Sequence, residues 1–338
     1  MKILVTGGCG YIGSHTVVEL QQSGFDVIIV DNLINSNVNV LEGITRITGC
    51  RPEFEQFDLV DTVRVDDFFA RHRDIKAVIH FAALKAVGES VHKPLEYYRN
   101  NLNSLMNVLN GMRTYGVKHL VFSSSCTVYG QAEVLPVTEC TPRKEAESPY
   151  GNTKVMCEDI IRDLMRVEPG MSALALRYFN PIGAHPSAYI GELPNGVPNN
   201  LIPFLTQTAI GQRPELSVFG NDYHTPDGSP LRDYIDVVDL ARAHVVGIRR
   251  LLEGRNKQNY EYFNIGTGRA LSVLEIIRAF ELTTGVPVKY KIVGRRAGDI
   301  EQVWADTTLA NQELGWKADT PIEETLANAW RWQLRLGK

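Results

Sequence analysis

The chain has few cysteines, and they lack the spacing of a disulfide framework or a zinc site. Five are spread over 338 residues, at positions 9, 50, 126, 140 and 157. Their number is odd, and none forms a Cys-x-x-Cys or Cys/His pattern with metal-ligand spacing. We therefore expect reduced thiols, no metal and a cytoplasmic protein.

Long apolar runs and clusters of basic residues are also missing. No apolar run reaches the roughly 18 residues that span a membrane. Met1-Lys2-Ile3 lead directly into a strand pattern, without a signal-peptide h-region. The net charge of −4 and the lack of a basic cluster argue against a nucleic-acid surface. We expect a globular protein of about two domains with no membrane or nucleic-acid partner.

The most informative stretch of the sequence lies near the N-terminus. A short apolar run (residues 3–5) is followed by Gly7, Gly10 and Gly13, a helical pattern, and a second apolar run that ends in Asp31. This order predicts a dinucleotide site, with the pyrophosphate at the helix N-terminus. Asp31 would accept a hydrogen bond from a ribose 2′-OH and repel a 2′-phosphate, which favours NAD over NADP.

Strand and helix patterns alternate through the first half of the chain. Strands are expected at 53–57, 77–83, 119–123 and 173–177, and helices at about 38–48, 63–72, 94–115 and 149–167. This alternation predicts a Rossmann-type α/β fold, a doubly wound parallel sheet. Ligands bind beyond the carboxyl ends of such strands, so the residues there should line one crevice: Gly7, Asp31, Asp58, Phe81, Ser125 and Asn180.

After Asn180, prolines and glycines separate short elements. Helices are expected at 235–250, at 273–282 and from 323 to the C-terminus, and a strand at 262–266. We expect an NAD-binding domain over 1–180, to which segments near 233–240 and 261–268 return. Residues 181–338 should form a smaller substrate-binding α/β domain.

A second chemical motif follows a predicted strand end. Ser148-Pro149 are typical of a helix start, and Tyr150 and Lys154 then lie on one helical face. A free tyrosine has a pKa near 10. A nearby ammonium and an oxidised nicotinamide would lower that pKa and make Tyr150 an acid/base near neutral pH. Ser125, at the end of the fifth predicted strand, could bind a substrate alcohol or carbonyl oxygen.

On these residues the sequence resembles the extended short-chain dehydrogenase/reductase superfamily, and more closely its UDP-glucose 4-epimerase (UDP-galactose 4-epimerase) family. The resemblance spans almost the full chain, through VTGGCGYIGSHT, VDNLINS, HFAALKAVGESVHKPLEYYRNN, FSSSCTVYG, SPYGNTK, LRYFNPIGAHPS, GVPNNLIPF, VFGNDYHTPDGSPLRDYIDVVDLARAH, FNIGTG and GRRAGD. It implies reversible epimerisation of UDP-glucose and UDP-galactose at C4 through a 4-keto intermediate. Tightly bound NAD would be reduced and re-oxidised within each cycle.

The resemblance also implies roles for individual residues. Tyr150 would take the proton of the C4 hydroxyl, Lys154 would tune Tyr150 and hold the nicotinamide ribose, and Ser125 would bind the C4 oxygen. The residues implied around NAD are Gly7, Gly10, Tyr11, Ile12, Gly13, Asp31, Asn32, Leu33, Asn35, Ser36, Asp58, Leu59, Phe81, Ala82, Ala83, Lys85, Asn100, Ser125, Tyr150, Lys154 and Phe179. Those implied around the UDP-sugar are Ser125, Tyr150, Asn180, Asn200, Leu201, Ser217, Phe219, Arg232, Arg296, Asp299 and Val303. The family usually forms homodimers through two helices per subunit, here about 94–115 and 149–167.

Several alternatives remain open. Nucleotide-sugar 4,6-dehydratases resemble the first half, but they carry an acid after the strand-end serine, where this chain has Cys126-Thr127-Val128. A UDP-uronate 4-epimerase or decarboxylase, another NAD-dependent nucleotide-sugar enzyme, and a non-catalytic NAD-sensing protein are further alternatives; the last would be expected to lose the Ser/Tyr/Lys set. Strict galactose epimerases resemble one another in a tyrosine at the position of Val303, so Val303 suggests that N-acetylated UDP-hexoses are also accepted. Cys126, His185 and His224 are expected to be structural or solvent-exposed.

Overall fold

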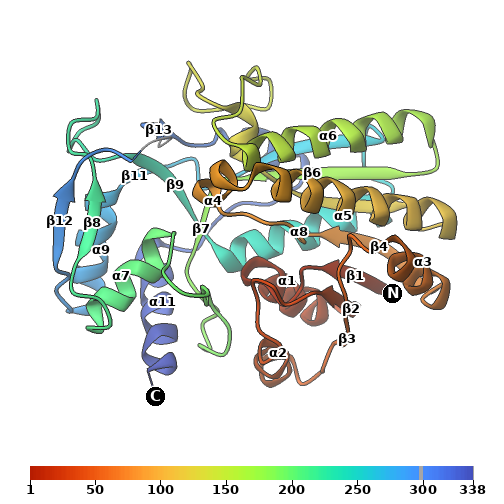
Figure 1. Ribbon diagram of the computed structural model, residues 1–338, viewed down its shortest axis with the longest axis horizontal. Helices are drawn as coiled ribbons and strands as arrows, with labels where there is room; N and C mark the ends of the chain where they lie inside the picture. Colours follow the sequence, from red (N-terminus) through yellow and green to blue (C-terminus); the bar gives the residue numbers. More distant parts are fainter. Residues whose placement is uncertain (297–299, 338) are drawn as a thin grey trace.

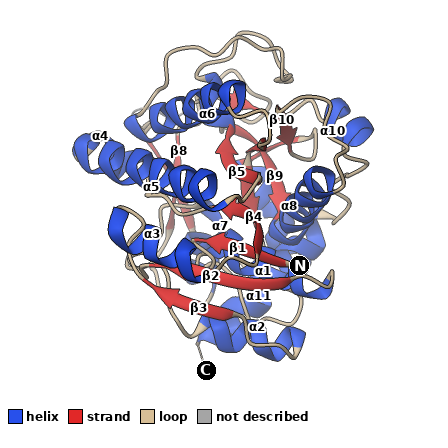
Figure 2. Cartoon of the chain, turned by 90° about the vertical axis from the view of Figure 1, so that its right-hand side faces the viewer, coloured by secondary structure: helices blue, strands red, loops and turns tan. Residues whose placement is uncertain are grey.

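The computed structural model describes residues 1–296 and 300–337. Its largest element is a seven-stranded parallel sheet in the order β10-β6-β5-β4-β1-β2-β3 (Figures 1 and 2). The strands are β1 (Lys2–Thr6), β2 (Asp26–Asp31), β3 (Glu53–Gln56), β4 (Ile75–His80), β5 (His119–Ser125), β6 (Ser172–Tyr178) and β10 (Tyr260–Ile265). The order reverses direction between β1 and β4. The predicted Rossmann-type fold is thereby confirmed, and the strand predicted at 262–266 does return to this sheet.

Helices cover both faces of the sheet, as the alternation of residues along β1 shows (Figure 2). Ile3 and Val5 are buried in one core, and Leu4, between them, is buried in another on the opposite face. The first core includes α1 (Tyr11–Gln22), α2 (Val40–Thr48), α8 (Val237–Leu252) and α10 (Thr308–Glu313). The second includes α3 (Thr62–Arg71), α5 (Pro94–Tyr115) and α6 (Pro149–Val167). Two short helices, α4 (Val87–His92) and η1 (Cys126–Tyr129), follow β4 and β5.

A smaller α/β unit lies beside the carboxyl end of the main sheet, at the left of Figure 1. One of its sheets contains β7 (Asn180–Ile182), β9 (Leu231–Asp236), β11 (Ala270–Ser272) and β13 (Gln302–Val303). A second sheet pairs β8 (Leu216–Phe219) with β12 (Tyr290–Val293). The helices α7 (Leu201–Ala209), α9 (Val273–Thr284) and α11 (Ile322–Leu336) pack around a separate core that contains Leu205, Phe280 and Leu326.

Several predicted boundaries differ from the structure by one to three residues, and for two of them the structure shows the reason. The helix predicted from Ile235 starts at Val237, because Ile235 and Asp236 still pair with β7 and the Asp236 carboxylate accepts a hydrogen bond from the Val238 N–H at the start of α8. The strand predicted over 77–83 ends at His80. Phe81 still donates its N–H to the Thr6 carbonyl, and the chain then turns away from the sheet.

The segment 183–200 connects β7 to α7 and is fixed from two sides. A Cβ on Gly43 of α2 would lie 2.5 Å from the Tyr189 carbonyl oxygen. Trp332 of α11 donates its indole N–H to the Glu192 carbonyl at 2.9 Å. A Cβ on Gly191 would lie 2.5 Å from the Trp332 ring. The segment is therefore held between a helix of the main sheet and the last helix of the smaller unit.

Within the described part of the chain, no helix combines the length and apolarity needed to cross a membrane. The same residues contain no group of three or more His, Cys, Asp or Glu side chains that could hold a metal ion. All five cysteines are free thiols.

We expect Gly191→Ala to destabilise the protein, because the added methyl overlaps the Trp332 ring. Overpacking of this kind costs about 1–3 kcal/mol in free energy of unfolding. Thermal unfolding measures the effect. The matched control is Gly170→Ala, where a Cβ meets nothing within 4 Å. Equal melting temperatures for the two variants would contradict the close packing of Gly191 on Trp332.

Candidate functional site

A cavity of about 1080 Å³ opens beyond the carboxyl ends of β1, β2, β4 and β5. Its wall comes from the main sheet, from the segment 183–200 and from the smaller unit. Most of the predicted site residues line it: Gly7, Gly10, Tyr11, Ile12, Gly13, Asp31, Asn32, Asn35, Ser36, Asp58, Leu59, Phe81, Ala82, Ala83, Lys85, Asn100, Ser125, Tyr150, Lys154, Phe179, Asn180, Asn200, Arg232, Arg296 and Val303. The fold thus brings together residues that are spread over almost the whole chain.

A few predicted site residues lie outside the cavity wall. Leu33, Leu201 and Ser217 do not line it. Phe219 does not line it either, but its ring centre lies 5.4 Å from the guanidinium carbon of Arg296, which does. Asp299 lies outside the described residues, so its predicted role stays a prediction.

The glycine turn has the geometry that a dinucleotide needs. Gly7 has φ of +71°, and a Cβ there would lie 2.7 Å from the Ala82 backbone nitrogen. A Cβ on Gly13 would lie 2.3 Å from the Gly7 carbonyl oxygen. Helix α1 begins after Gly10 without a side-chain cap, so its first N–H groups face the cavity. This arrangement fits a pyrophosphate at the helix N-terminus.

Asp31 ends β2 and is held firmly by its surroundings. Its Oδ1 accepts hydrogen bonds from the Leu33 N–H (2.8 Å) and the Ser36 hydroxyl (2.9 Å), and its Oδ2 accepts one from the Cys9 N–H (3.0 Å). A carboxylate offers about four acceptor positions. One position on Oδ2 therefore remains for a ligand hydroxyl, as the sequence predicts for an adenosine ribose. Leu33 itself adopts a φ of +62°, a backbone strain that closes this turn.

Ser125, Tyr150 and Lys154 meet where α6 packs on the end of β5. The Ser148 hydroxyl accepts the Gly151 N–H at 3.1 Å and fixes the start of α6. Lys154, one turn after Tyr150, donates its ammonium to the Ser123 carbonyl at 2.6 Å. Its Nζ lies 5.9 Å from the Tyr150 ring centre, and Ser125 lies near enough to the Tyr150 hydroxyl to lower its pKa. Ser125, Tyr150 and Lys154, which are predicted to act together, are therefore neighbours in the structure.

Burial is the largest influence on the pKa values of Tyr150 and Lys154. It raises the pKa of the Tyr150 hydroxyl far above its usual value, although the neighbouring Ser125 lowers that pKa. It lowers the pKa of Lys154 to about 8. The Lys154 ammonium alone does not offset the desolvation of a tyrosinate. A further positive charge in the cavity is needed before Tyr150 can act as a base near neutral pH.

The opposite wall of the cavity is built by β9 and β13. Val303 is buried and pairs with Arg232 in register. The adjacent Asp233 is fully buried and accepts hydrogen bonds from Thr267 (backbone and side chain), Gly268 and Ala305. Asp233 therefore fixes both strands, and with them Arg232 and Val303, against the turn after β10.

The comparisons with known proteins agree with this geometry. A family model described as GDP-mannose 4,6 dehydratase matches residues 4–329. A UDP-glucose 4-epimerase of Bacillus subtilis (strain 168) is 52% identical over 333 residues, which are 98% of this chain and 97% of that protein. The chain belongs to the UDP-glucose 4-epimerase family.

Solved structures support the same family assignment. A UDP-glucose 4-epimerase from Bifidobacterium longum, in complex with NAD+ and UDP, is 46% identical with a TM-score of 0.94, covering 99% of this chain and 98% of that one. A UDP-glucose 4-epimerase from Stenotrophomonas maltophila, with NAD and formylated UDP-arabinopyranose bound, is 49% identical with a TM-score of 0.95, covering 100% and 99%.

The site also sets this epimerase-family chain apart from the dehydratase alternative. Cys126, which follows the strand-end serine, lines the cavity, and burial raises the pKa of its thiol to about 12. It therefore supplies neither an acid near neutral pH nor an activated nucleophile.

Several cavity residues of this family member were not predicted from the sequence, among them Glu192, Trp332 and Arg335. Glu192 accepts a hydrogen bond from the Asn200 side-chain amide at 2.6 Å, and its carboxylate lies 3.8 Å from the Lys85 ammonium. Trp332 and Arg335 reach the cavity from α11. Glu192 lies in an irregular loop, and α11 comes from the far end of the chain, so no local pattern indicates their position.

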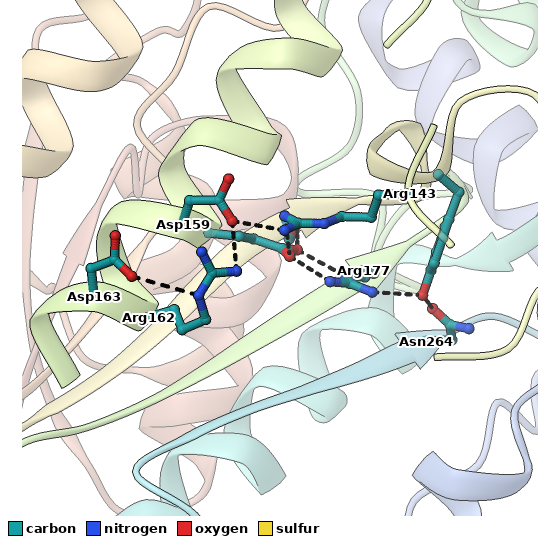
Figure 3. A network of polar contacts seen from close by, with 9 residues as sticks. Arg143, Asp159, Arg162, Asp163, Arg177 and Asn264 are labelled. Atoms are coloured by element: carbon teal, nitrogen blue, oxygen red, sulfur yellow. Dashed lines mark hydrogen bonds and ion pairs between the residues drawn. The ribbon is translucent and has the colours of Figure 1, made fainter. Parts of the chain in front are cut away.

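A buried polar network links α6 to β5, β6 and β10, and part of it is drawn in Figure 3. Glu158 of α6 accepts two hydrogen bonds from the Arg177 guanidinium and one from the Ser124 hydroxyl at 2.6 Å. Arg177 also donates to the Tyr129 hydroxyl at 2.9 Å, and Tyr129 donates to Asn264 of β10 at 2.7 Å. Glu158 lies four residues after Lys154, a helical spacing that could have indicated it from the sequence.

We expect Glu158→Gln to lower the free energy of unfolding by about 3–5 kcal/mol, because it leaves a buried guanidinium without its counter-charge. Urea unfolding measures the loss. The control is Arg166→Gln, which removes an exposed ion pair with Asp163 and should cost less than about 1 kcal/mol. Equal losses in the two variants would contradict the burial of the Glu158–Arg177 pair.

Proposed function

We propose that this chain interconverts UDP-glucose and UDP-galactose by inverting the configuration at C4, through a 4-keto intermediate, with NAD that stays bound throughout. One observation carries the proposal: a dinucleotide turn and the Tyr150, Lys154 and Ser125 set line the same cavity, beside Arg232 and Arg296. Relatives over the full chain length are UDP-glucose 4-epimerases, one of them solved with NAD+ and UDP.

The residues of the chain act on the proton and the orientation of the sugar. Tyr150 removes the proton of the C4 hydroxyl at its phenolic oxygen and returns it later in the cycle. Ser125 hydrogen-bonds the C4 oxygen, and Lys154 stabilises the tyrosinate charge. Bound NAD supplies the hydride acceptor and donor for C4 and, when oxidised, the additional positive charge that Tyr150 requires.

The UDP-sugar is held by the smaller unit in this proposal. Arg232 and Arg296 line the cavity and suit the diphosphate, because guanidinium groups bind its oxygens in pairs. Asn180 and Asn200 line the same region and can bond sugar or phosphate oxygens. Phe219, stacked near Arg296, offers an apolar contact for uracil. Leu201, Ser217 and Asp299 are proposed to complete the nucleotide site.

Tight retention of NAD follows from the shape of the site. Epimerisation has no net oxidation, so the cofactor has no need to leave between cycles. The segment 183–200 borders the cavity, and its Glu192 approaches Lys85 of the main-sheet unit. We therefore expect the purified protein to contain bound NAD that is released only when the protein is denatured.

We expect Tyr150→Phe to abolish turnover while leaving the bound NAD in place. Loss of one acid/base group costs roughly 100- to 10,000-fold in rate. The two measurements are the conversion of UDP-galactose to UDP-glucose without added cofactor, and the NAD released per chain on denaturation. Wild-type protein that lacks NAD and turns over only when NAD is added would favour a dehydrogenase instead. Unchanged activity in Tyr150→Phe would remove Tyr150 from the acid/base role.

Val303 motivates a proposed extension to UDP-N-acetylglucosamine and UDP-N-acetylgalactosamine. It lines the cavity and pairs with Arg232 on the sugar side. Strict galactose epimerases resemble one another in a tyrosine at this position. The smaller valine leaves room for a C2 acetamido group.

We expect Val303→Tyr to reduce turnover of the N-acetylated UDP-hexoses by roughly tenfold or more, because pocket size sets this kind of discrimination. Turnover of plain UDP-hexoses should change little. Val303→Ala serves as the control and should keep both activities. Absence of N-acetyl turnover in the wild-type protein would refute the extension.

We also propose the domain, assembly and compartment of this chain. Residues 1–180, with segments near 233–240 and 261–268, form the NAD domain, and 181–338 form the UDP-sugar domain, consistent with the separate core around Phe280. Exposed Leu95 and Met106 on α5 and Met156 on α6 support a homodimer through these neighbouring helices. Five free thiols fit the cytoplasm.

A further inference from the structure

Two side-chain contacts join α6 to the end of β5, and the proposed reaction uses only one of them. Lys154 donates to the Ser123 carbonyl, and Glu158, one turn later, accepts from the Ser124 hydroxyl at 2.6 Å. Ser124 is fully buried and precedes the catalytic Ser125 directly. Glu158 is buried as well and touches neither the cavity wall nor, in the proposed mechanism, the substrate.

The register between β5 and β6 shows which residues lie beside the Ser124–Glu158 bond. Ser124 pairs with Arg177, and Ser125 pairs with Tyr178 on the neighbouring strand β6. Glu158 therefore lies over the Ser124–Arg177 pair and bonds both strands at once. One carboxylate holds the helix that carries Tyr150 and Lys154 at a fixed position on the strand that carries Ser125.

We propose that Glu158 and Ser124 are positioning residues for epimerisation, which hold Ser125 in place beside Tyr150. The inference rests on the proposed function. Without the Ser124–Glu158 bond, β5 keeps its ladder bonds to β4 and β6. Ser124, the residue before Ser125, loses its side-chain bond to α6, so Ser125 and Tyr150 can move apart.

The test uses Ser124→Ala, because this change spares the Glu158–Arg177 ion pair. Its matched control is Ser172→Ala. Ser172 is also a buried serine of the β5–β6 pair, and its hydroxyl bonds His119 at 2.9 Å at the opposite end of the two strands. Both variants lose one hydroxyl bond and should retain NAD. The melting temperature should fall further in Ser124→Ala, because its bond is to a buried carboxylate.

We expect kcat of Ser124→Ala to fall by roughly 10- to 100-fold, since a misplacement of about 1 Å can cost that much. Its KM for UDP-galactose should stay near the wild-type value, because Arg232 and Arg296 are untouched. Ser172→Ala should keep kcat within about twofold, as surface and remote hydroxyl losses act on stability alone. Equal kcat values in the two variants would overturn the proposal.

The pH profile gives a readout that a merely structural role would not move. The titratable groups around Tyr150 are Lys154 on α6, Cys126 of η1, Tyr178 of β6 and Tyr97 of α5. Both variants leave all of these in place. The Ser125 hydroxyl lowers the pKa of Tyr150, so its displacement should move the acidic limb of the kcat profile to higher pH in Ser124→Ala alone. An unshifted profile would overturn the proposal.

A titration without turnover separates this proposal from the proposed function. Tyrosinate absorbance in the NAD-loaded protein, minus that of Tyr150→Phe, reports Tyr150 directly. If the wild-type protein fails to epimerise UDP-hexoses, the proposed function fails. The positioning role is then judged by whether Ser124→Ala raises the Tyr150 titration and Ser172→Ala leaves it unchanged.

Discussion

The packing of α6 on the carboxyl end of β5 is the constraint on which the site depends. The Lys154 ammonium is buried there and bonded to the Ser123 carbonyl. Burial that deep raises the pKa of Tyr150 and lowers that of Lys154. The same burial strengthens every charge interaction within the site. Tyr150 is therefore a poor base by itself, and it lies where a positively charged cofactor lowers its pKa most strongly.

This dependence makes the cofactor part of the catalytic group rather than a second substrate. The glycine turn, Asp31 and the segment 183–200 surround one cavity, and residues from both ends of the chain close it. An oxidoreductase that exchanges its cofactor with solution needs an open route. Here α11, the last helix, contributes Trp332 and Arg335 to the cavity wall. Contacts spread over the length of the chain suit a cofactor that stays bound while hydrogen leaves C4 and returns to C4.

Sequence reasoning reached the parts of the site that depend on local spacing. The glycine turn, the acid after the second strand, and Tyr150 and Lys154 on one helical turn are readable without a structure. The start of α8 was predicted two residues too early. Ile235 and Asp236 pair with β7, whose residues lie far away in the sequence. Glu192 was missed for the same reason: its partners Lys85 and Asn200 meet only when the two units pack together. Glu158 could have been found from its spacing after Lys154.

The most direct measurement follows the hydrogen at C4 of the sugar. UDP-galactose labelled with deuterium at C4 is converted by the NAD-containing protein, and the UDP-glucose formed is analysed by mass spectrometry or NMR. We predict that the deuterium remains at C4, because the bound NAD that accepts it returns it to the same carbon. Deuterium that is lost to the solvent, or that appears in free cofactor, would contradict the mechanism.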